Sequence, residues 1–155
     1  MHLEKIEIQG FKSFAQKTTL EFPKPNLVTK NYGIACVVGP NGSGKSNIVD
    51  AIRWVLGEQS LKNLRGKKSE DVIFSGSETK TRLGMAYVAM HINNEDGRMP
   101  VDYKEVVISR KLYRNGDSEY RINKSKVRLQ DIIMILAKAN FGQKLDKAYS
   151  HSDPR

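Results

Sequence analysis

Residues 39–46 read GPNGSGKS, and this stretch decides the fold. It matches the pattern G-x-x-x-x-G-K-[ST] at every position, the pattern of a phosphate-binding loop between a strand and a helix. Because glycine has no Cβ, the backbone of such a loop can approach a phosphate closely and turn its N–H groups toward the oxygens. The stretch therefore predicts a nucleotide site.

Each part of the loop has an expected chemical role. The Lys45 ammonium is expected to contact the β- and γ-phosphates, and the Ser46 hydroxyl is expected to bind Mg²⁺. The helix that opens near Gly44 directs its unpaired N–H groups and its positive dipole end at the same anion. The remaining residues of the predicted cradle are Pro40, Asn41, Gly42 and Ser43.

The sequence on both sides fits this motif. Residues 34–38 (IACVV) are an uninterrupted apolar run, which predicts a strand buried on both faces with Cys36 as a small core residue. After the loop, apolar residues recur at the spacing of one helix face, at positions 48, 51, 52, 55 and 56. Gly57 is expected to end that helix.

The rest of the chain alternates between extended and helical patterns. The dipeptide Asn115-Gly116 predicts a tight hairpin turn in which both residues have positive φ. Further strands are predicted at residues 3–9, 18–22, 85–92, 106–113 and 118–122, and a second helix at 129–136. The predicted fold class is α/β, with a mixed sheet that contains antiparallel hairpins.

Composition excludes several classes of protein. The chain has 155 residues, of which 39% are hydrophobic and 28% charged, as expected for one globular domain. A single cysteine excludes an internal disulfide. The first residues lack a signal-peptide pattern, and no apolar run approaches about 18 residues. We therefore expect a cytoplasmic protein without a membrane partner.

The charge balance points to a polyanionic partner. The formal net charge is +9, and Lys and Arg exceed Asp and Glu by six within residues 104–147. Net charge informs on partners rather than on fold. We expect DNA binding that is independent of sequence and mediated by phosphate contacts.

The catalytic set of a phosphate-loop ATPase is incomplete in this chain. Such enzymes hold Mg²⁺ with an acidic residue that follows an apolar strand. The apolar run at residues 132–136 is followed by Ala137-Lys138, and Asp71 precedes its apolar neighbours rather than following them. The sequence therefore predicts nucleotide binding without a catalytic residue of its own.

Several motifs together carry a family resemblance. The segments are residues 11–14 (FKSF), 39–48 (GPNGSGKSNI), 50–60 (DAIRWVLGEQS), 64–66 (LRG), 71–77 (DVIFSGS) and 113–120 (YRNGDSEY). They resemble the start of bacterial-type SMC (structural maintenance of chromosomes) proteins of the RecF/RecN/SMC family, over residues 3–142. The resemblance implies the N-terminal lobe of a phosphate-loop NTPase head of the ABC type, in a protein associated with the nucleoid.

The resemblance also implies cofactors and partners. SMC heads bind ATP and Mg²⁺ between two heads, and a homodimer is expected here. A C-terminal lobe of the same full-length protein brings the Mg²⁺-holding aspartate, the catalytic glutamate and the signature motif. Hydrolysis is then expected to drive the organisation of DNA during chromosome condensation and segregation.

Four residues outside the cradle acquire roles by the same resemblance. Lys12 and Ser13 match residues near the base and ribose, and Arg65 matches an arginine loop that lies near the nucleotide and couples it to DNA. Asn47, at the helix start, is interpreted as a phosphate-side or capping residue.

The sequence departs from the family near its end. Tyr149-Ser150 fits the family pattern, but the glutamine that contacts Mg²⁺ and the attacking water does not follow. We interpret residues 1–150 as the lobe of an incomplete head and residues 151–155 as a tail of the kind that a truncation would leave. Two alternatives stay open: a RecF/RecN-type DNA-repair ATPase lobe, and a non-catalytic fragment that binds DNA or a partner.

Overall fold

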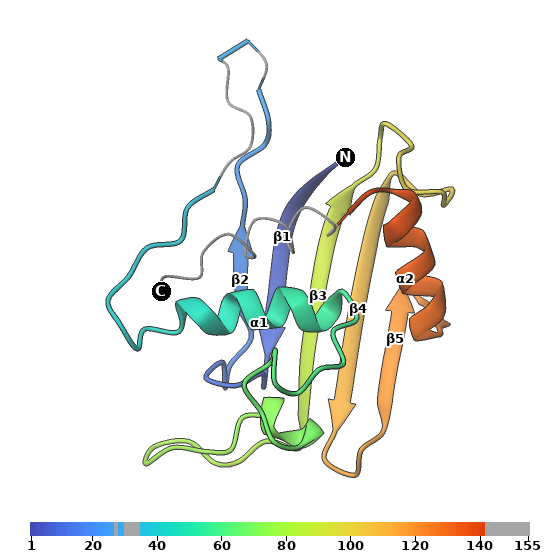
Figure 1. Ribbon diagram of the computed structural model, residues 1–155. Coiled ribbons are helices and arrows are strands. Elements are labelled where there is room, and N and C mark those ends of the chain that lie inside the picture. The colour runs from blue at the N-terminus through green and yellow to red at the C-terminus, as the bar shows by residue number, and fades with distance from the viewer. Residues whose placement is uncertain (27, 30–34, 142–155) are drawn as a thin grey trace, which may run out of the picture.

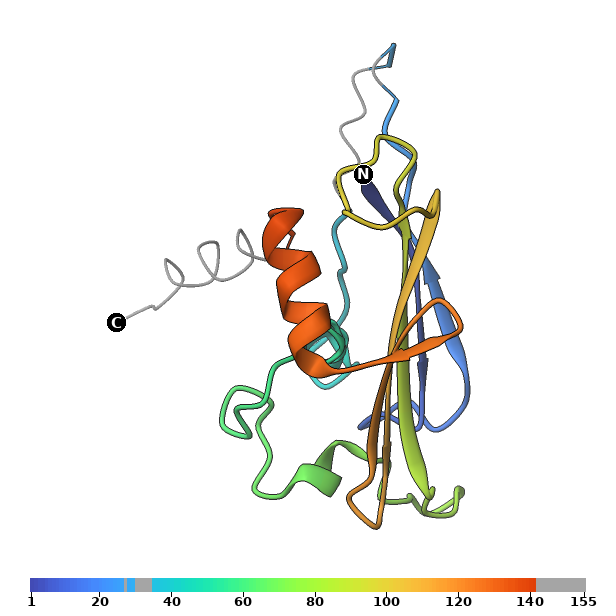
Figure 2. The same ribbon diagram turned by 90° about the vertical axis from the view of Figure 1, so that its right-hand side faces the viewer.

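Six strands form one sheet, and both α-helices cover the same face of it (Figures 1 and 2). The computed structural model describes residues 1–26, 28, 29 and 35–141. The strands are β1 (His2–Gln9), β2 (Thr18–Glu21), β3 (Met85–Asn93), β4 (Glu105–Tyr113), β5 (Ser118–Ile122) and β6 (Ser125–Val127). The helices are α1 (Lys45–Val55), the 3₁₀ turn η1 (Ser69–Val72) and α2 (Leu129–Lys138).

The sheet has the order β2-β1-β3-β4-β5-β6, and every pairing among the described residues is antiparallel. Alternation along β3 sorts its side chains between the two faces. Val88, Met90 and Ile92 are buried in the core, whereas Tyr87 and His91 lie on the other face and are partly exposed. The α/β class is confirmed, but the parallel pairing expected of a mixed sheet does not occur in the described part.

The hairpin between β4 and β5 lies where the sequence predicts it, with a different turn. Gly116 has φ 92°, but Asn115 does not have a positive φ. The Gly116 amide donates to the Tyr113 carbonyl at 2.9 Å, and the Tyr113 amide donates to the Asp117 carbonyl at 2.9 Å. The prediction of two left-handed residues was wrong, because this longer connection needs only one, at the glycine.

Helix α1 crosses the sheet and buries a stripe that differs from the predicted one. Its buried residues are Asp50, Ala51, Trp54 and Val55. Ile52 and Leu56 are only partly buried at the margin of the core. The helix is therefore rotated by about one residue from the orientation that apolar spacing predicts, and a carboxylate enters the buried face.

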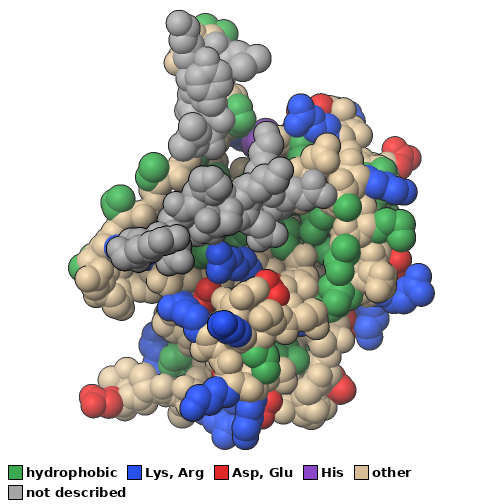
Figure 3. Space-filling view, viewed as in Figure 1, with side chains coloured by type: hydrophobic (Ala, Val, Ile, Leu, Met, Phe, Trp, Pro, Cys, Tyr) green, Lys and Arg blue, Asp and Glu red, His purple; other side chains and the backbone are tan. Residues whose placement is uncertain are grey.

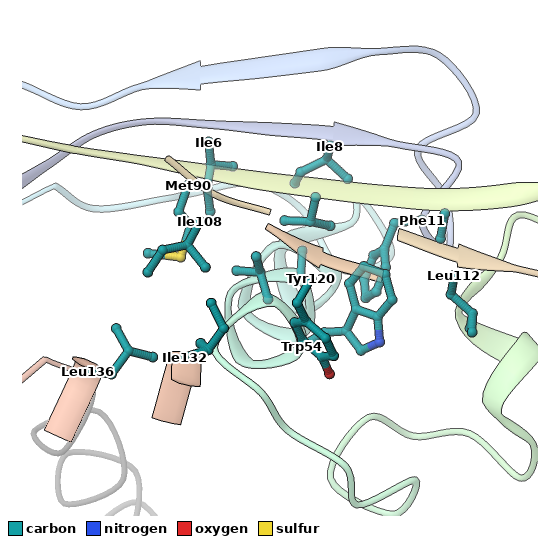
Figure 4. Packing of buried hydrophobic residues seen from close by; sticks show 14 of the residues in the cluster. Ile6, Ile8, Phe11, Trp54, Met90, Ile108, Leu112, Tyr120, Ile132 and Leu136 are labelled. Carbon is teal, nitrogen blue, oxygen red and sulfur yellow. The ribbon is translucent and has the colours of Figure 1, made fainter. Parts of the chain in front are cut away.

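The core lies between the sheet and the two helices (Figure 4). The Trp54 and Phe11 rings lie 5.2 Å apart between centroids, at an angle of 43°. Trp54 is 2% exposed and Phe11 is fully buried, so this tryptophan packs in the core. Ile132 and Leu136 of α2 close the other side of the same core.

Arg110 of β4 ties the end of α1 to the sheet. Its guanidinium lies 4.5 Å from the centroid of the Trp54 ring and 4.8 Å from that of Tyr120. It donates to the carbonyls of Trp54 at 3.0 Å and Glu58 at 3.2 Å. Burial lowers the pKa of Arg110 and raises that of Tyr120. A cation at this end of α1 also complements the helix dipole.

The strand predicted at residues 34–38 is absent from the described residues. Residues 35–38 are irregular and exposed, with Val38 at 88% exposure, and Ile34 lies outside the described part. Cys36 is exposed, so its assignment to the core was wrong. A strand buried on both faces needs neighbours on either side, and in Figure 1 this segment runs clear of the sheet.

The remaining predicted elements are confirmed to within a few residues. Residues 132–136 lie inside α2, which settles that this apolar run is helical. Strand β6 and the turn η1 were not predicted.

No helix in the described residues is long and apolar enough to cross a membrane. Residues 142–155, which include Tyr149-Ser150 and the predicted tail, lie outside the described part.

Candidate nucleotide site

The phosphate loop is a turn that leads directly into α1. Gly44 precedes the first helical residue, Lys45, and has φ 95°, while Gly42 has φ 81°. Only glycine enters these conformations without a steric penalty. The Ser43 amide donates to the Pro40 carbonyl at 3.2 Å and closes the turn. Asn47 and Ile48 donate to the Gly44 carbonyl, which leaves the N–H groups of Lys45 and Ser46, without a backbone partner in the described residues, available to an anion.

Lys45 reaches back across this loop. Its Nζ donates to the carbonyl oxygen of Gly39, at the loop's other end. A Cβ at Gly39 would lie 2.7 Å from the Ser43 Oγ, so a larger residue there would force that hydroxyl to move. The loop therefore closes around the lysine ammonium, which lies among backbone groups that can bind phosphate.

A hollow of about 240 Å³ opens at this loop. Its lining combines an ammonium, a guanidinium, a hydroxyl and glycine backbone, and no lining residue in the described part is acidic. This donor set fits a polyphosphate, and the Ser46 hydroxyl can serve as a single ligand to Mg²⁺. The lining residues are Asn41, Gly42, Gly44, Lys45, Ser46, Asn47 and Arg65.

A second hollow of about 530 Å³ adjoins the first. Lys12 and Ser13 line it, and Asn47 and Arg65 line both hollows. The structure therefore brings together the loop residues and the four residues assigned by resemblance. Pro40 and Ser43 support the loop but line neither hollow. Several Lys and Arg side chains gather in the lower half of the helix-bearing face (Figure 3).

Asn47 links the elements around the site. Its Nδ2 donates to the Ser13 Oγ at 2.8 Å, and its Oδ1 accepts from the Arg65 Nη2 at 2.9 Å. These contacts join the start of α1 to the segment after β1 and to the loop at residues 64–66. Asn47 thus bridges two side chains of the site.

Asp50 is a residue of this site that the sequence did not reveal. It accepts from the Lys12 Nζ, and from the Arg65 Nε at 3.0 Å and Nη2. Its side chain is 5% exposed. The available signal was its position three residues after Asn47, which places both on one helix face.

Asp71 has a structural role beside the second hollow. Its Oδ2 accepts from the backbone N–H groups of Lys68 at 2.9 Å and Lys67 at 2.7 Å. These hydrogen bonds, that of Lys68 first, hold the pKa of Asp71 below its usual value. The carboxylate therefore fixes the start of η1.

The sequence of the whole lobe matches one family model. The RecF/RecN/SMC N terminal domain matches residues 2–145. The chain belongs to this family. Among curated SMC relatives, the chromosome partition protein Smc of Desulfitobacterium hafniense (strain Y51) is 56% identical over 130 residues, which are 84% of this chain and 10% of that protein. This SMC lobe thus spans about a tenth of the length of such a relative.

Solved SMC heads share the fold. A chain from work on the ATP-driven dimerization and DNA-stimulated activation of SMC ATPases superposes with a TM-score of 0.83 at 35% identity, covering 99% of this chain and 93% of that one. The Smc head of Pyrococcus furiosus bound to the C-terminal domain of ScpA gives 0.83 at 36% identity, covering 99% and 39%. The chain therefore corresponds to part of an SMC ATPase head, its N-terminal lobe.

The likeness to RecF is more distant. The ATP complex of the recombination mediator RecF gives a TM-score of 0.57 at 24% identity, over 81% of this chain and 27% of that one. At this identity the match shows a shared fold alone. The higher identity to Smc proteins favours the SMC branch over the RecF branch.

Proposed function

We propose that this SMC lobe is the ATP- and Mg²⁺-binding half of a chromosome-organising ATPase head. The observation that carries the proposal is the hollow at the phosphate loop, where Lys45, Ser46 and Arg65 line one space. All three are suited to bind or ligate a polyphosphate and its metal. Mg²⁺, when bound, neutralises phosphate charge.

The chain's own groups bind and orient rather than catalyse. The Lys45 ammonium and the first N–H groups of α1 hold the phosphates, and the Ser46 hydroxyl ligates the metal. Two carboxylates that contact residues around the site already accept hydrogen bonds from other groups: Asp50 accepts from two cations, and Asp71 accepts from two backbone amides. We infer that the Mg²⁺-holding aspartate and the catalytic glutamate come from a C-terminal lobe.

The exposed apolar segment before the loop supports this inference. Val37 is 51% exposed and Val38 is 88% exposed, and Cys36 lies between residues that have no strand partner in the described part. Apolar β-branched residues in this position favour a strand once neighbours are present. A C-terminal lobe that supplied neighbouring strands would bury the segment and stabilise the phosphate loop that follows it.

The isolated chain is expected to bind Mg-ATP but not to turn it over. Adding a matching C-terminal lobe is expected to restore slow hydrolysis, because that lobe supplies the missing carboxylates and the signature loop. The measurement is phosphate release, with Lys45→Ala as the blank. Robust turnover by the chain alone that disappears in Lys45→Ala would place a complete catalytic set within these residues.

The reactivity of the single cysteine provides a test of the association with a C-terminal lobe that does not depend on ATP hydrolysis. Cys36 is exposed and is expected to react freely with a thiol reagent in the chain alone. Addition of a cysteine-free C-terminal lobe should slow the reaction as residues 35–38 become a buried strand. Unchanged reactivity in a complex that hydrolyses ATP would contradict the proposed strand.

We further propose that two such heads form a homodimer around ATP and that the assembly acts on DNA. Support comes from the likeness to a chain studied in ATP-driven SMC dimerization. A cytoplasmic, nucleoid-associated location follows from that role.

The structure reduces the number of Lys and Arg residues in the basic segment 104–147 that are candidates for contact with DNA. Arg110 is buried, and Arg114 donates to the backbone carbonyls of Leu83 and Phe74. By contrast, three exposed cations stand at alternate positions around edge strand β6: Lys124 in the turn before it, Lys126 within it and Arg128 directly after it. We propose that this cationic row contacts DNA phosphates, although edge lysines also protect a sheet from aggregation.

Duplex binding through this row is expected to be independent of sequence and to weaken steeply with salt. Three phosphate contacts correspond to a slope of about −2.7 in log K against log salt concentration. Replacing Lys124, Lys126 and Arg128 with glutamine should remove most of that slope in a fluorescence-anisotropy titration. Lys24→Gln, in the loop after β2, is the control. A flat salt dependence, or preference for one sequence, would reject the proposal.

Two other functions remain as outcomes of these tests. Absence of hydrolysis with every C-terminal lobe tried, together with salt-dependent DNA binding, would favour a non-catalytic binding fragment. A RecF-type repair role would be favoured if the full-length protein lacked the long heptad pattern that SMC proteins carry after this lobe. Reading the coding sequence downstream of residue 155 distinguishes that possibility.

A further inference from the structure

Lys12 and Arg65 share a backbone conformation that is rare for their residue types. Their φ angles are 49° and 55°. Among described non-glycine residues, the others with positive φ are Asn123 and Asn140. Asparagine enters the left-handed region readily, whereas lysine and arginine do so only at a steric penalty. Such strain persists where surrounding contacts hold it, and it concentrates at functional sites.

One carboxylate holds both strained residues. Asp50 accepts from the Lys12 Nζ and from the Arg65 guanidinium, and its side chain is 5% exposed. The Lys12 Nζ also donates to the carbonyl of Leu64, the residue before Arg65. Asp50 on α1 therefore anchors the segment after β1 and the arginine loop to the helix that begins at the phosphate loop.

The two cations differ in what they can still bind. The Lys12 side chain is 12% exposed, whereas that of Arg65 is 53% exposed and lines the hollow at the phosphate loop. Asp50 engages the Nε and Nη2 edge of the guanidinium, and Asn47 takes a further Nη2 contact. Within the described residues, the hydrogen bonds of the Arg65 guanidinium involve Nε and Nη2 and not Nη1. The two Nη1 N–H groups remain for an oxygen ligand.

We propose that Asp50 is a positioning residue for nucleotide binding: it fixes the Arg65 guanidinium at the rim of the phosphate loop with Nη1 available to a phosphate oxygen. The inference rests on the proposed function of the loop and adds a residue to it. Lys12 secures the arrangement from the other side, because its ammonium bonds both Asp50 and the backbone beside Arg65. A planar guanidinium held along one edge binds phosphate with little further loss of freedom.

The test is a double-mutant cycle on the full chain, read by calorimetric titration with Mg-ATP. Asp50→Asn is expected to weaken binding about ten-fold where Arg65 is present, the scale of one misaligned charge-assisted contact. In an Arg65→Gln background the same change should weaken binding less than about two-fold, because the group that Asp50 positions is gone. Asp50→Glu, which keeps the charge, should recover most of the affinity.

Matched variants separate positioning from general destabilisation. Asp131→Asn removes a carboxylate that accepts from the Arg128 amide at the start of α2, and should lower the melting temperature without changing affinity. If Asp50→Asn leaves Lys12 uncompensated and fails to fold, Lys12→Met/Asp50→Asn removes the unpaired cation and permits the same comparison.

The outcomes distinguish this inference from the function on which it rests. If Asp50→Asn weakened Mg-ATP binding equally with Arg65 present and with Arg65→Gln, Asp50 would have a structural role only. That result would overturn the inference. Unchanged affinity in Asp50→Asn, with Lys45→Ala still impaired, would overturn it while the nucleotide site stands. Absence of Mg-ATP binding by the unmodified chain would overturn the nucleotide site itself, and the positioning role with it.

Discussion

Replacing Lys45 with alanine is expected to weaken Mg-ATP binding by about 3 kcal/mol, or roughly a hundred-fold in Kd. The Lys45 ammonium lies inside the phosphate loop, where its described hydrogen bond goes to the Gly39 carbonyl. A bound polyphosphate places more negative charge there than one carbonyl does, so the ammonium stabilises the bound state far more than the free one. Isothermal titration calorimetry gives the comparison directly.

Stability measurements exclude a trivial cause for that loss. Lys45 contributes one hydrogen bond to a loop at the surface, so Lys45→Ala should melt within a few degrees of the unmodified chain. Lys62→Ala is the control, because Lys62 is an exposed cation that lines neither hollow. This variant should bind Mg-ATP with unchanged affinity. Equal affinity of Lys45→Ala and the unmodified chain would reject the phosphate-loop assignment.

Replacing Trp54 with alanine is expected to lower the free energy of unfolding by about 3–5 kcal/mol. Trp54 is 2% exposed, and its indole packs on Phe11 and lies against the Arg110 guanidinium. Its removal leaves a cavity at the junction of α1 and the sheet and deprives a buried cation of its aromatic contact. The melting temperature should fall by roughly 10 °C, since each kcal/mol shifts a chain of this size by about 2–4 °C.

Urea unfolding followed by far-UV circular dichroism is the appropriate measurement, because Trp54 is the only tryptophan and its fluorescence is lost in the variant. Trp54→Phe keeps an aromatic ring in the cavity and should lose less than half as much stability. Tyr103→Ala, at a residue 52% exposed, should change stability by less than about 1 kcal/mol. A small effect of Trp54→Ala would mean that α1 is not held to the sheet through this ring.

The sequence predicted the phosphate loop and most elements because those features depend on local chemistry. Glycines at positions 42 and 44 permit backbone conformations that other residues resist, and the helix follows from Lys45 as the motif requires. Alternation along β3 and β4 reports burial on one face of a sheet. The family resemblance, confirmed over residues 2–145, rests on the same local motifs.

Residues 34–38 show where local pattern fails. Their apolar run reads as a buried strand, but residues 35–38 are irregular and exposed. A run of β-branched residues becomes a strand only when another strand supplies hydrogen-bond partners and another layer covers its faces. Neither lies beside the segment in the described part of the chain. The prediction of Cys36 as a core residue failed for the same reason.

The sequence by itself determined that a phosphate loop joins α1 and that an antiparallel hairpin follows, because short-range sterics and periodicity suffice for both. Tertiary structure decided how the residues around that loop are held. It brought Lys12 and Arg65, 53 positions apart in the sequence, onto the buried Asp50 carboxylate, and set Arg110 between Trp54 and Tyr120. Such contacts depend on how the segments pack against one another, and neither spacing nor composition encodes that geometry.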